Sequence, residues 1–406
     1  MIRQQKYTLS DKMDFTKLTA YLDGVVEDGR VPGVDCIVTK GYETVFRHFS
    51  GMSDIKNGKL MQGDEEYLIF SMTKMLTCTC ALQLLEQGKY LLSDPVSMYL
   101  PEFEKMKISN TVVKGDASKI TTGQSMGESV EVKSDGYAEN PITIKHLFSM
   151  TAGLDYNLES ESIRKTLSEG RTSTRELVGA ISETVLAFEP GTHFQYSLCH
   201  DVLGALIEVW SGKTLGEYMK ENLFDVLGMN RTFFGVSKDR EILDKMAVRY
   251  NYISDGEFEE KPLEIVYNLS DEYESGGAGL SSCAEDYSLF LQALANNGVA
   301  KNGNRILSKA SIDLMRTNQL CPEAYKDFGG LHSGYGYGLG VRTHVDKQTS
   351  GSLSPVGEFG WDGAAGAFSM VDTENKISIT YFQHMHGWDV RLQRELRNVV
   401  YSCIKE

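Results

Sequence analysis

The feature of this 406-residue chain that most restricts its fold is a long stretch almost free of charge. From Tyr67 to Leu85 the sole charged side chain is Lys74, although 24% of the chain is charged. Apolar residues cover most faces of a helix here, and Gly88 supplies a stop signal. A helix that is apolar all round must be buried. Serine, threonine and glutamine interrupt the run, so we predict a buried helix over about 71–87 rather than a membrane span.

Strand patterns gather at both ends of the chain, and helical patterns lie between them. Residues 34–50 predict two strands around a turn, and three segments after residue 330 resemble antiparallel strands. Helical patterns occupy 143–150, 175–187, 198–211, 215–228 and 389–403. This order predicts an α+β fold. We expect an antiparallel β-sheet domain from residues 1–75 and 275–406, flanked by helices, and an inserted mainly helical domain over 76–274.

Composition restricts the partners and the compartment. The net charge of −15 argues against nucleic acid, which needs a clustered basic face, and against anionic membranes. Seven cysteines with scattered spacing and no visible signal peptide favour reduced thiols and a cytoplasmic location. Residues 107–140 are polar and predict a loop insertion, with a lid or a solvated loop as alternatives. Nothing here predicts an oligomeric state.

A Ser-x-x-Lys pattern occurs four times, one of them at residues 402–405, and only context separates the other three copies. The copy at 53–56 lies in a polar, turn-like stretch, and the copy at 162–165 lies in a charged one. The third copy, Ser71 with Lys74, follows an apolar run and opens the apolar helix. This third copy is therefore the candidate for chemistry.

The spacing of Ser71 and Lys74 suits a nucleophile and its base. Three residues apart on a helix, the two side chains lie on one face. A hydroxyl in the first turn lies near free backbone N–H groups, which favour developing negative charge. A lysine among apolar neighbours loses hydration and becomes a better base, which a serine needs before it attacks a carbonyl. In the structural alternative, Ser71 caps the helix and Lys74 extends to the surface.

Two further segments are candidates for the same site. Tyr196 is predicted at the junction of a loop and a helix, where a side chain can project into a cleft and relay protons beside an ammonium. A packing role is the alternative, because the chain has 20 tyrosines. Small residues from Gly363 to Gly366 allow close approach to the backbone, whose free N–H groups could hold an oxyanion. A tight strand crossing is the alternative there.

The Ser71–Lys74 pair, Tyr196 and the segment from Gly363 to Gly366, in this order along the chain, resemble the three motifs of the serine β-lactamase and penicillin-binding protein superfamily. The closest likeness is to its class C-type esterase and acyltransferase branch, which includes family VIII carboxylesterases. The likeness extends over well over half of the chain. It is carried by "FSMTKMLTCTCALQLLEQGKYLLSDPVSMYLPEF", "PITIKHLFSMTAGL", "FEPGTHFQYS", "LFDVLGMNRTFF" and "SGGAGLSSCAEDYSLFLQAL". Together these stretches are far more specific than one short motif.

The resemblance implies a role for each candidate. Ser71 resembles the family nucleophile, Lys74 its partner base and Tyr196 the tyrosine of the second motif. By analogy the oxyanion hole would be formed by the backbone N–H groups of Ser71 and Ala364. The fold implied is an antiparallel sheet covered by helices, with the site between the sheet and a helical domain.

Two departures from the family pattern bear on the substrate. Leu198 stands where the second motif usually has asparagine, and it cannot make amide hydrogen bonds. Trp361, Asp362 and Gly363 occupy the place of a motif that usually begins with a cation and a hydroxyl, which hold a substrate carboxylate. Asp362 could add the wrong charge. We therefore expect an uncharged acyl substrate bound against the Trp361 ring.

The leading hypothesis is a serine hydrolase acting through acyl-Ser71 on small esters or amides, with no cofactor. The alternatives are a β-lactamase or D,D-peptidase, and a sensor that is acylated without turnover. His384 and His386 alternate on a predicted strand, but no third metal ligand is evident. We expect two histidines near a surface and no metal site.

Overall fold

The computed structural model describes residues 13–109, 134, 136–265, 267–329 and 332–404. Its main sheet has eight strands in the order β12-β13-β14-β15-β16-β1-β2-β3, and each neighbouring pair is antiparallel. The strands are β1 (Gly33–Lys40), β2 (Glu43–Asp54), β3 (Lys59–Leu60), β12 (Tyr335–Tyr337), β13 (Arg342–His344), β14 (Phe359–Gly360), β15 (Phe368–Asp372) and β16 (Ile377–Phe382). Strands from both ends of the chain thus share one sheet, which confirms the predicted α+β fold.

The two faces of this sheet support two cores. Alternate β1 side chains point to opposite faces, so Val34 and Cys36 join one core and Ile37 the other. Helices α1 (Thr16–Glu27) and α15 (Val390–Cys403) pack together over the first face. Helix α11 (Ala284–Ala295) packs on the second face against β1, β15 and β16. The prediction of a last amphipathic helix over 389–403 is confirmed by α15.

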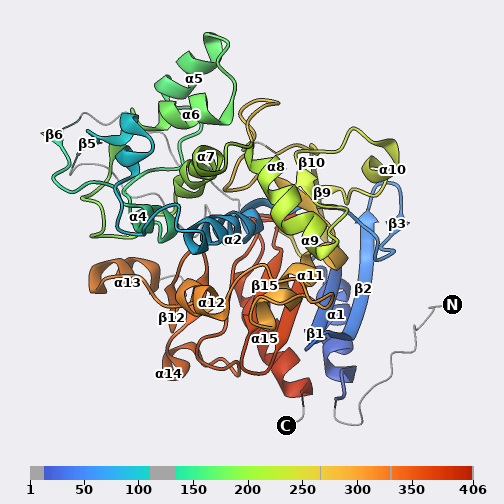
Figure 1. Ribbon diagram of the computed structural model, residues 1–406. Coiled ribbons are helices and arrows are strands. Elements are labelled where there is room, and N and C mark those ends of the chain that lie inside the picture. The colour runs from blue at the N-terminus through green and yellow to red at the C-terminus, as the bar shows by residue number, and fades with distance from the viewer. Residues whose placement is uncertain (1–12, 110–133, 135, 266, 330–331, 405–406) are drawn as a thin grey trace.

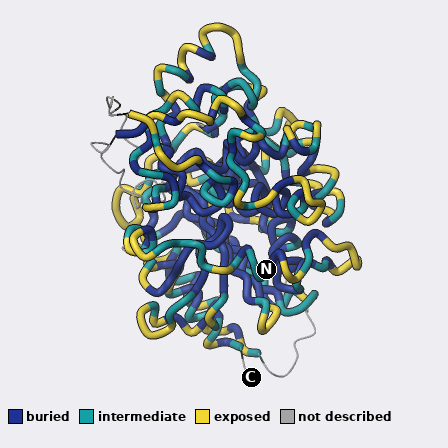
Figure 2. The backbone as a smooth tube through the Cα atoms, turned by 60° about the vertical axis from the view of Figure 1, so that its left-hand side comes forward, coloured by how far each residue is buried: buried dark blue, intermediate teal, exposed yellow. Residues whose placement is uncertain are grey.

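Helix α2 (Thr73–Glu86) crosses the centre of the molecule, with the sheet on one side and α7 on the other (Figure 1). Each residue from Thr73 to Leu82 is buried, and Figure 2 shows buried backbone concentrated in the interior of the molecule. The predicted buried helix over about 71–87 is confirmed, although its first turn, Phe70–Met72, is a 3-10 helix.

Short helices make up most of the region beside α2 (Figure 1). They are α4 (Ile144–Phe148), α5 (Glu161–Ser168), α6 (Thr174–Ile181), α7 (Cys199–Ser211), α8 (Leu215–Met219) and α9 (Asp225–Leu227). One predicted helix was too long, because the 175–187 pattern ends as a helix at Ile181. The predicted helix over 215–228 is confirmed over Leu215–Leu227, with a π-helical turn at Lys220–Phe224 in its middle. The division into two domains stays a prediction.

The remaining elements form three small sheets and peripheral helices. The sheets are β10-β9-β17, β4-β11-β8 and β6-β5-β7. Their strands are β4 (Tyr67–Leu68), β5 (Lys107–Ile108), β6 (Gly136–Tyr137), β7 (Val185–Leu186), β8 (Phe233–Phe234), β9 (Arg249–Ser254), β10 (Glu257–Lys261), β11 (Leu280–Ser282) and β17 (Met385–His386). The peripheral helices are α10 (Arg240–Leu243), α12 (Lys309–Met315), α13 (Pro322–Gly329) and α14 (Lys347–Ser350), with 3-10 turns at Val96–Met98 and Pro101–Phe103. Most of the predicted 107–140 insertion lies outside the described residues.

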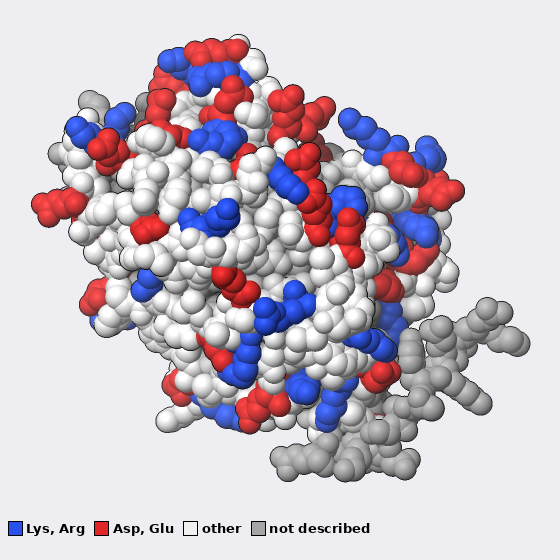
Figure 3. All heavy atoms as spheres, viewed as in Figure 1, with Lys and Arg blue, Asp and Glu red and all other residues white. Residues whose placement is uncertain are grey.

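Charged side chains on the face shown in Figure 3 are interspersed by sign rather than gathered into one basic surface. Within the described ranges, no helix combines the length and the apolar character needed to cross a bilayer.

Candidate active site

The Ser71 side chain lies at a tightly held corner that leads into α2. Phe70, which precedes it, has a φ of +45° and is fully buried. A left-handed conformation costs a residue with a side chain about 1–3 kcal/mol and persists only where the surroundings enforce it. Here the Ile69 N–H donates to the Leu280 carbonyl at 3.0 Å, and the Met72 N–H donates to the Ile69 carbonyl at 3.1 Å. The corner leaves Ser71 half-buried at the mouth of the helix.

The Lys74 side chain is 0% exposed, so the alternative in which it extends to the surface is wrong. Its Nζ donates to Ser71 Oγ at 3.2 Å, to Tyr156 Oη at 3.4 Å and to the Gly277 carbonyl at 2.7 Å. Burial lowers the pKa of Lys74 to about 7, and the negative charge of Asp201 opposes this shift. Near neutral pH a large fraction of Lys74 is therefore a free amine beside the Ser71 hydroxyl.

Tyr196 lies against the Lys74 amine. Lys74 Nζ is 4.6 Å from the centre of the Tyr196 ring. The indole Nε1–H of Trp361 donates to Tyr196 Oη at 3.2 Å. Burial raises the pKa of Tyr196, and side-chain hydrogen bonds with Ser71 and Trp361 oppose that rise. The structure thus brings Ser71, Lys74 and Tyr196 together, while their catalytic roles stay predictions.

Sequence reasoning missed two polar residues of this site, Tyr156 and Asp201. The Tyr156 ring is stacked on the Tyr196 ring, with centroids 5.7 Å apart. Asp201 is buried on α7, and its Oδ1 accepts from Ser275 Oγ at 2.6 Å and from Tyr273 Oη at 2.9 Å. Burial raises the pKa of Asp201, and the Lys74 charge lowers it.

A signal for Asp201 was present in the sequence. Like Lys74, it is a single charged residue within an apolar helical run, "LCHDVLGALI". A charge among apolar neighbours is rarely tolerated without a partner. Tyr156 has no comparable signal, because a tyrosine in a loop is common.

The segment from Trp361 to Ala364 passes directly beside the corner that holds Ser71. A Cβ atom on Gly363 would lie 2.6 Å from the Ile69 carbonyl oxygen, so a side chain at this position would separate the two segments. The Ala364 carbonyl accepts from Trp388 Nε1 at 3.2 Å. Its N–H donates to no acceptor among the described residues. Within the described part of the chain, the Ala364 N–H therefore remains free for a ligand, and its role as an oxyanion donor stays a prediction.

The expectation that Asp362 adds an unfavourable negative charge to the substrate site is wrong. The carboxylate is buried, and its Oδ1 is 2.6 Å from Arg342 Nη1 in an ion pair. Arg342 and Arg397 both approach Glu358, which completes a buried cluster of two cations and two anions. The negative charge of Asp362 is therefore compensated inside the protein. It does not act as an unpaired charge that repels an anionic substrate.

Leu198, the fourth residue predicted to bind substrate, has a buried side chain, and its role stays a prediction. It is buried and immediately precedes α7, where its N–H donates to the Asp155 carbonyl at 3.0 Å. Its side chain belongs to the main hydrophobic core. The residue fixes the start of the helix that follows Tyr196.

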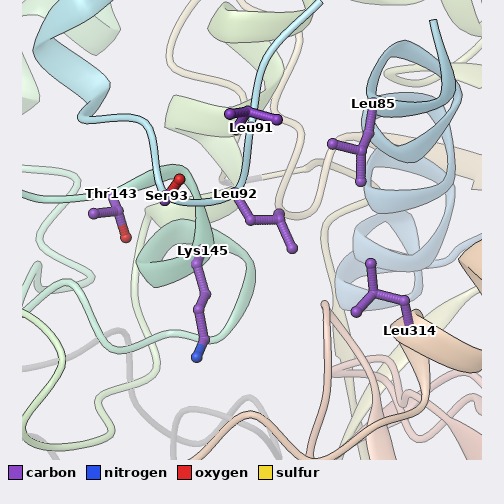
Figure 4. A pocket seen from close by; sticks show the side chains of 7 residues that line it. All are labelled: Leu85, Leu91, Leu92, Ser93, Thr143, Lys145 and Leu314. Carbon is purple, nitrogen blue, oxygen red and sulfur yellow. The ribbon is translucent and has the colours of Figure 1, made fainter. Parts of the chain in front are cut away.

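A separate hollow of about 620 Å³ lies beside the C-terminal half of α2 (Figure 4). It is lined by Leu85, Leu91, Leu92, Ser93, Thr143, Lys145 and Leu314. None of the predicted catalytic or substrate-binding residues belongs to this set. The hollow is therefore a different feature from the Ser71 site.

The chain matches the sequence profile of the Beta-lactamase family over residues 18–401, and it belongs to this family. Esterase EstB from Burkholderia gladioli is 28% identical to it over 95% of each chain. Lovastatin esterase from Penicillium rubens is 28% identical over 74% of this chain and 72% of its own. These comparisons confirm the resemblance stated from the motifs.

Solved structures show the same fold. EstCE1, a hydrolase with promiscuous acyltransferase activity, superimposes with a TM-score of 0.75 and 24% identity, covering 95% of this chain and 97% of its own. Simvastatin Synthase (LovD) from Aspergillus terreus gives a TM-score of 0.75 at 21% identity, covering 96% and 98%.

Proposed function

We propose that this protein is a serine hydrolase or acyltransferase that acts on small esters or amides through an acyl-Ser71 intermediate. The observation that carries the proposal is the fully buried Lys74 amine, 3.2 Å from Ser71 Oγ. The names of its relatives, an esterase and a lovastatin esterase, support the same class of reaction. The Ser-x-x-Lys motif then consists of the nucleophile and its base.

Acylation begins with proton transfer from Ser71 Oγ to the neutral amine of Lys74. The oxygen forms a bond to the substrate carbonyl carbon, and the carbonyl oxygen becomes an oxyanion. The N–H groups of Ser71 and Ala364 would hold this charge. When the tetrahedral intermediate collapses, the bond to the leaving oxygen breaks, and Tyr196 or Lys74 supplies the proton that this oxygen needs.

Deacylation repeats these steps with a different nucleophile. Water, an alcohol or an amine gives a proton to Lys74 or Tyr196 and attacks the acyl carbonyl. Ser71 Oγ leaves and takes a proton back. Tyr196 is suited to this exchange because it contacts the Lys74 amine and accepts a hydrogen bond from Trp361, which stabilises negative charge on the phenol oxygen.

An uncharged acyl group fits the surroundings best. The Tyr196 ring is packed between Tyr156 and Trp361, with each pair of ring centroids 5.7 Å apart. The cation and hydroxyl that bind a β-lactam carboxylate in relatives are replaced by Trp361 and the ion-paired Asp362. The acyl substrate is thus the only partner that we propose.

The cysteines support a cytoplasmic location. All seven are free thiols in the structure, and six of them are buried. A reducing compartment would preserve this state.

Replacing Ser71 by alanine tests the proposal directly. We expect Ser71→Ala to abolish turnover of a 4-nitrophenyl ester without changing the melting temperature, because only the nucleophile is lost. Ser162→Ala, in another Ser-x-x-Lys copy, is the matched control and should keep full activity. Intact-mass measurement should find one acyl group on the wild-type protein and none on Ser71→Ala. Unchanged turnover by Ser71→Ala would overturn the assignment.

The two other hypotheses give different results in the same assays. A β-lactamase or D,D-peptidase would hydrolyse nitrocefin or D-alanyl substrates faster than simple esters. A sensor would release one equivalent of nitrophenol and then stop, with the acyl group still on Ser71. We expect steady turnover of esters and little hydrolysis of nitrocefin.

A further inference from the structure

A small internal cavity of about 10 Å³ lies beside the candidate nucleophile corner. Phe70 and Ala365 both line it. Phe70 precedes Ser71, and Ala365 follows Ala364, so the cavity touches both segments that carry the predicted oxyanion donors. Its polar wall includes Tyr67, Arg249 and Gln383.

Each of these three polar side chains has one buried atom without a hydrogen-bond partner among the described residues. The atoms are Tyr67 Oη, Arg249 Nε and Gln383 Nε2. The side chains belong to residues that are only 2%, 7% and 2% exposed. A fourth lining side chain, the buried His384, likewise has no partner for its Nε2 among the described residues. Leaving a buried polar group unsatisfied costs about 1–3 kcal/mol, and four such groups around one cavity point to a bound ligand.

Arg249 and Gln383 each use their other polar atoms in hydrogen bonds outside the cavity, so one N–H donor of each side chain is left to face it. Arg249 Nη1 and Nη2 donate to the carbonyls of Glu264 and Pro262 at 3.0 and 2.6 Å, which leaves Nε. Gln383 Oε1 accepts from Tyr381 Oη at 2.9 Å, so the amide nitrogen is the end that remains. The two free donors are therefore set by contacts outside the cavity.

The size of the cavity decides between the ligands that these groups could bind. A volume of about 10 Å³ is near the lower limit for one water molecule, which also needs two to four polar partners. Chloride would suit the Arg249 cation, but it is larger than water. A water oxygen can accept from Arg249 Nε and Gln383 Nε2 and donate to Tyr67 Oη.

We propose that one water molecule is a permanent part of this site, held by Arg249, Gln383 and Tyr67. Through these contacts it ties the Phe70 corner to the turn that carries Ala364. The contact of Gln383 with that turn is close, because a Cβ atom on Gly366, which has a φ of +85°, would collide with the Gln383 amide nitrogen. Gln383 is thus a positioning residue for the oxyanion donors. This role rests on the proposed function, whereas the water site itself does not.

A high-resolution crystal structure tests the water site without any activity measurement. We expect an isolated peak of electron density about 2.7–3.2 Å from Arg249 Nε, Gln383 Nε2 and Tyr67 Oη. A crystal soaked in bromide should show no anomalous signal at this peak. A missing peak, or a bromide signal in its place, would overturn the proposal.

Kinetics of Gln383→Leu test the positioning role. We expect kcat for a nitrophenyl ester to fall about 10-fold, less than the loss of a whole oxyanion donor, while KM stays within about twofold. Gln393→Leu is the matched control, because Gln393 is another buried glutamine with an unpartnered Nε2, on α15. It should keep kcat. An unchanged kcat in Gln383→Leu, or an equal loss in both variants, would refute the positioning role. Failure of the serine mechanism would instead show in Ser71→Ala.

Discussion

At the scale of single residues, the chemistry depends on how the surroundings change ordinary side chains. Among the residues that the structure describes, Lys74 has three hydrogen-bond acceptors around its amine and no carboxylate bonded to it. Asp201 acts on it through charge alone and itself is hydrogen-bonded to Ser275 and Tyr273. The three acceptors hold the Lys74 side chain in place, and the Asp201 charge favours its ammonium form. Burial has the larger effect and lowers the pKa, so the proton is easy to remove.

The first prediction concerns the pH dependence of ester hydrolysis. Because only the neutral amine of Lys74 is a base, kcat/KM should rise with pH through an apparent pKa of about 7 and then level off. The folded-state pKa lies below the ordinary value of 10.5, so the folded protein binds fewer protons between these two values. The contribution of Lys74 to the free energy of unfolding should therefore increase as pH rises over that window.

Steady-state kinetics across this pH range give the measurement, and Lys74→Arg is the informative variant. Its guanidinium stays charged, so activity should be lost at every pH. A wild-type rate that does not vary through neutral pH would contradict the role of Lys74.

At the scale of elements, the site depends on a turn that is anchored by buried charge. Arg342 on β13 holds Asp362 next to the Trp361 side chain and also donates to the Ser369 carbonyl of β15 at 2.9 Å. Arg397 on α15 completes the cluster through Glu358. The strand end that presents Trp361 to Tyr196 is thus fixed to the sheet and to its covering helix.

The second prediction is that Asp362→Ala destabilises the protein strongly. The substitution leaves the buried Arg342 without its close partner, and the free energy of unfolding should fall by about 3–5 kcal/mol. Asp313→Ala is the matched control, because it breaks a partly exposed pair with Arg316 and should cost about 1 kcal/mol or less. Urea denaturation measures both values. Equal losses of unfolding free energy in the two variants would show that the buried ion pair contributes no more to stability than the partly exposed one.

At the scale of the whole molecule, five of the six buried thiols lie within two closely packed cores. Cys36 and Cys403 belong to the core under α1 and α15, and Cys78 and Cys80 lie on the central helix. None of the seven cysteines forms a disulfide, and only Cys321 is partly exposed. The stability of the fold therefore comes from burial of apolar surface rather than from cross-links.

The third prediction follows from this distribution. A thiol reagent should label one cysteine rapidly in the native protein and seven after denaturation. Cys321→Ser should remove the rapid phase. A reducing agent should leave the melting temperature unchanged, and a lower melting temperature with reductant would reveal a disulfide.

Local patterns predicted many elements, but they failed where burial depends on distant partners. His384 was expected near a surface and is buried, because the Tyr250 ring packs against it at 5.7 Å. This contact joins residues 134 positions apart, so it is not visible in the local sequence.

The sequence by itself determined the order of the elements, the buried central helix and the identity of the Ser71 and Lys74 pair, because these depend on patterns within a few residues. Only the tertiary structure decided that Tyr196 and Trp361, 165 positions apart, meet through a hydrogen bond above that pair. It also decided that Asp362 is ion-paired with Arg342 and that the Asp201 charge acts on Lys74. Such contacts depend on how the sheet and helices pack, and packing is a property of the whole chain.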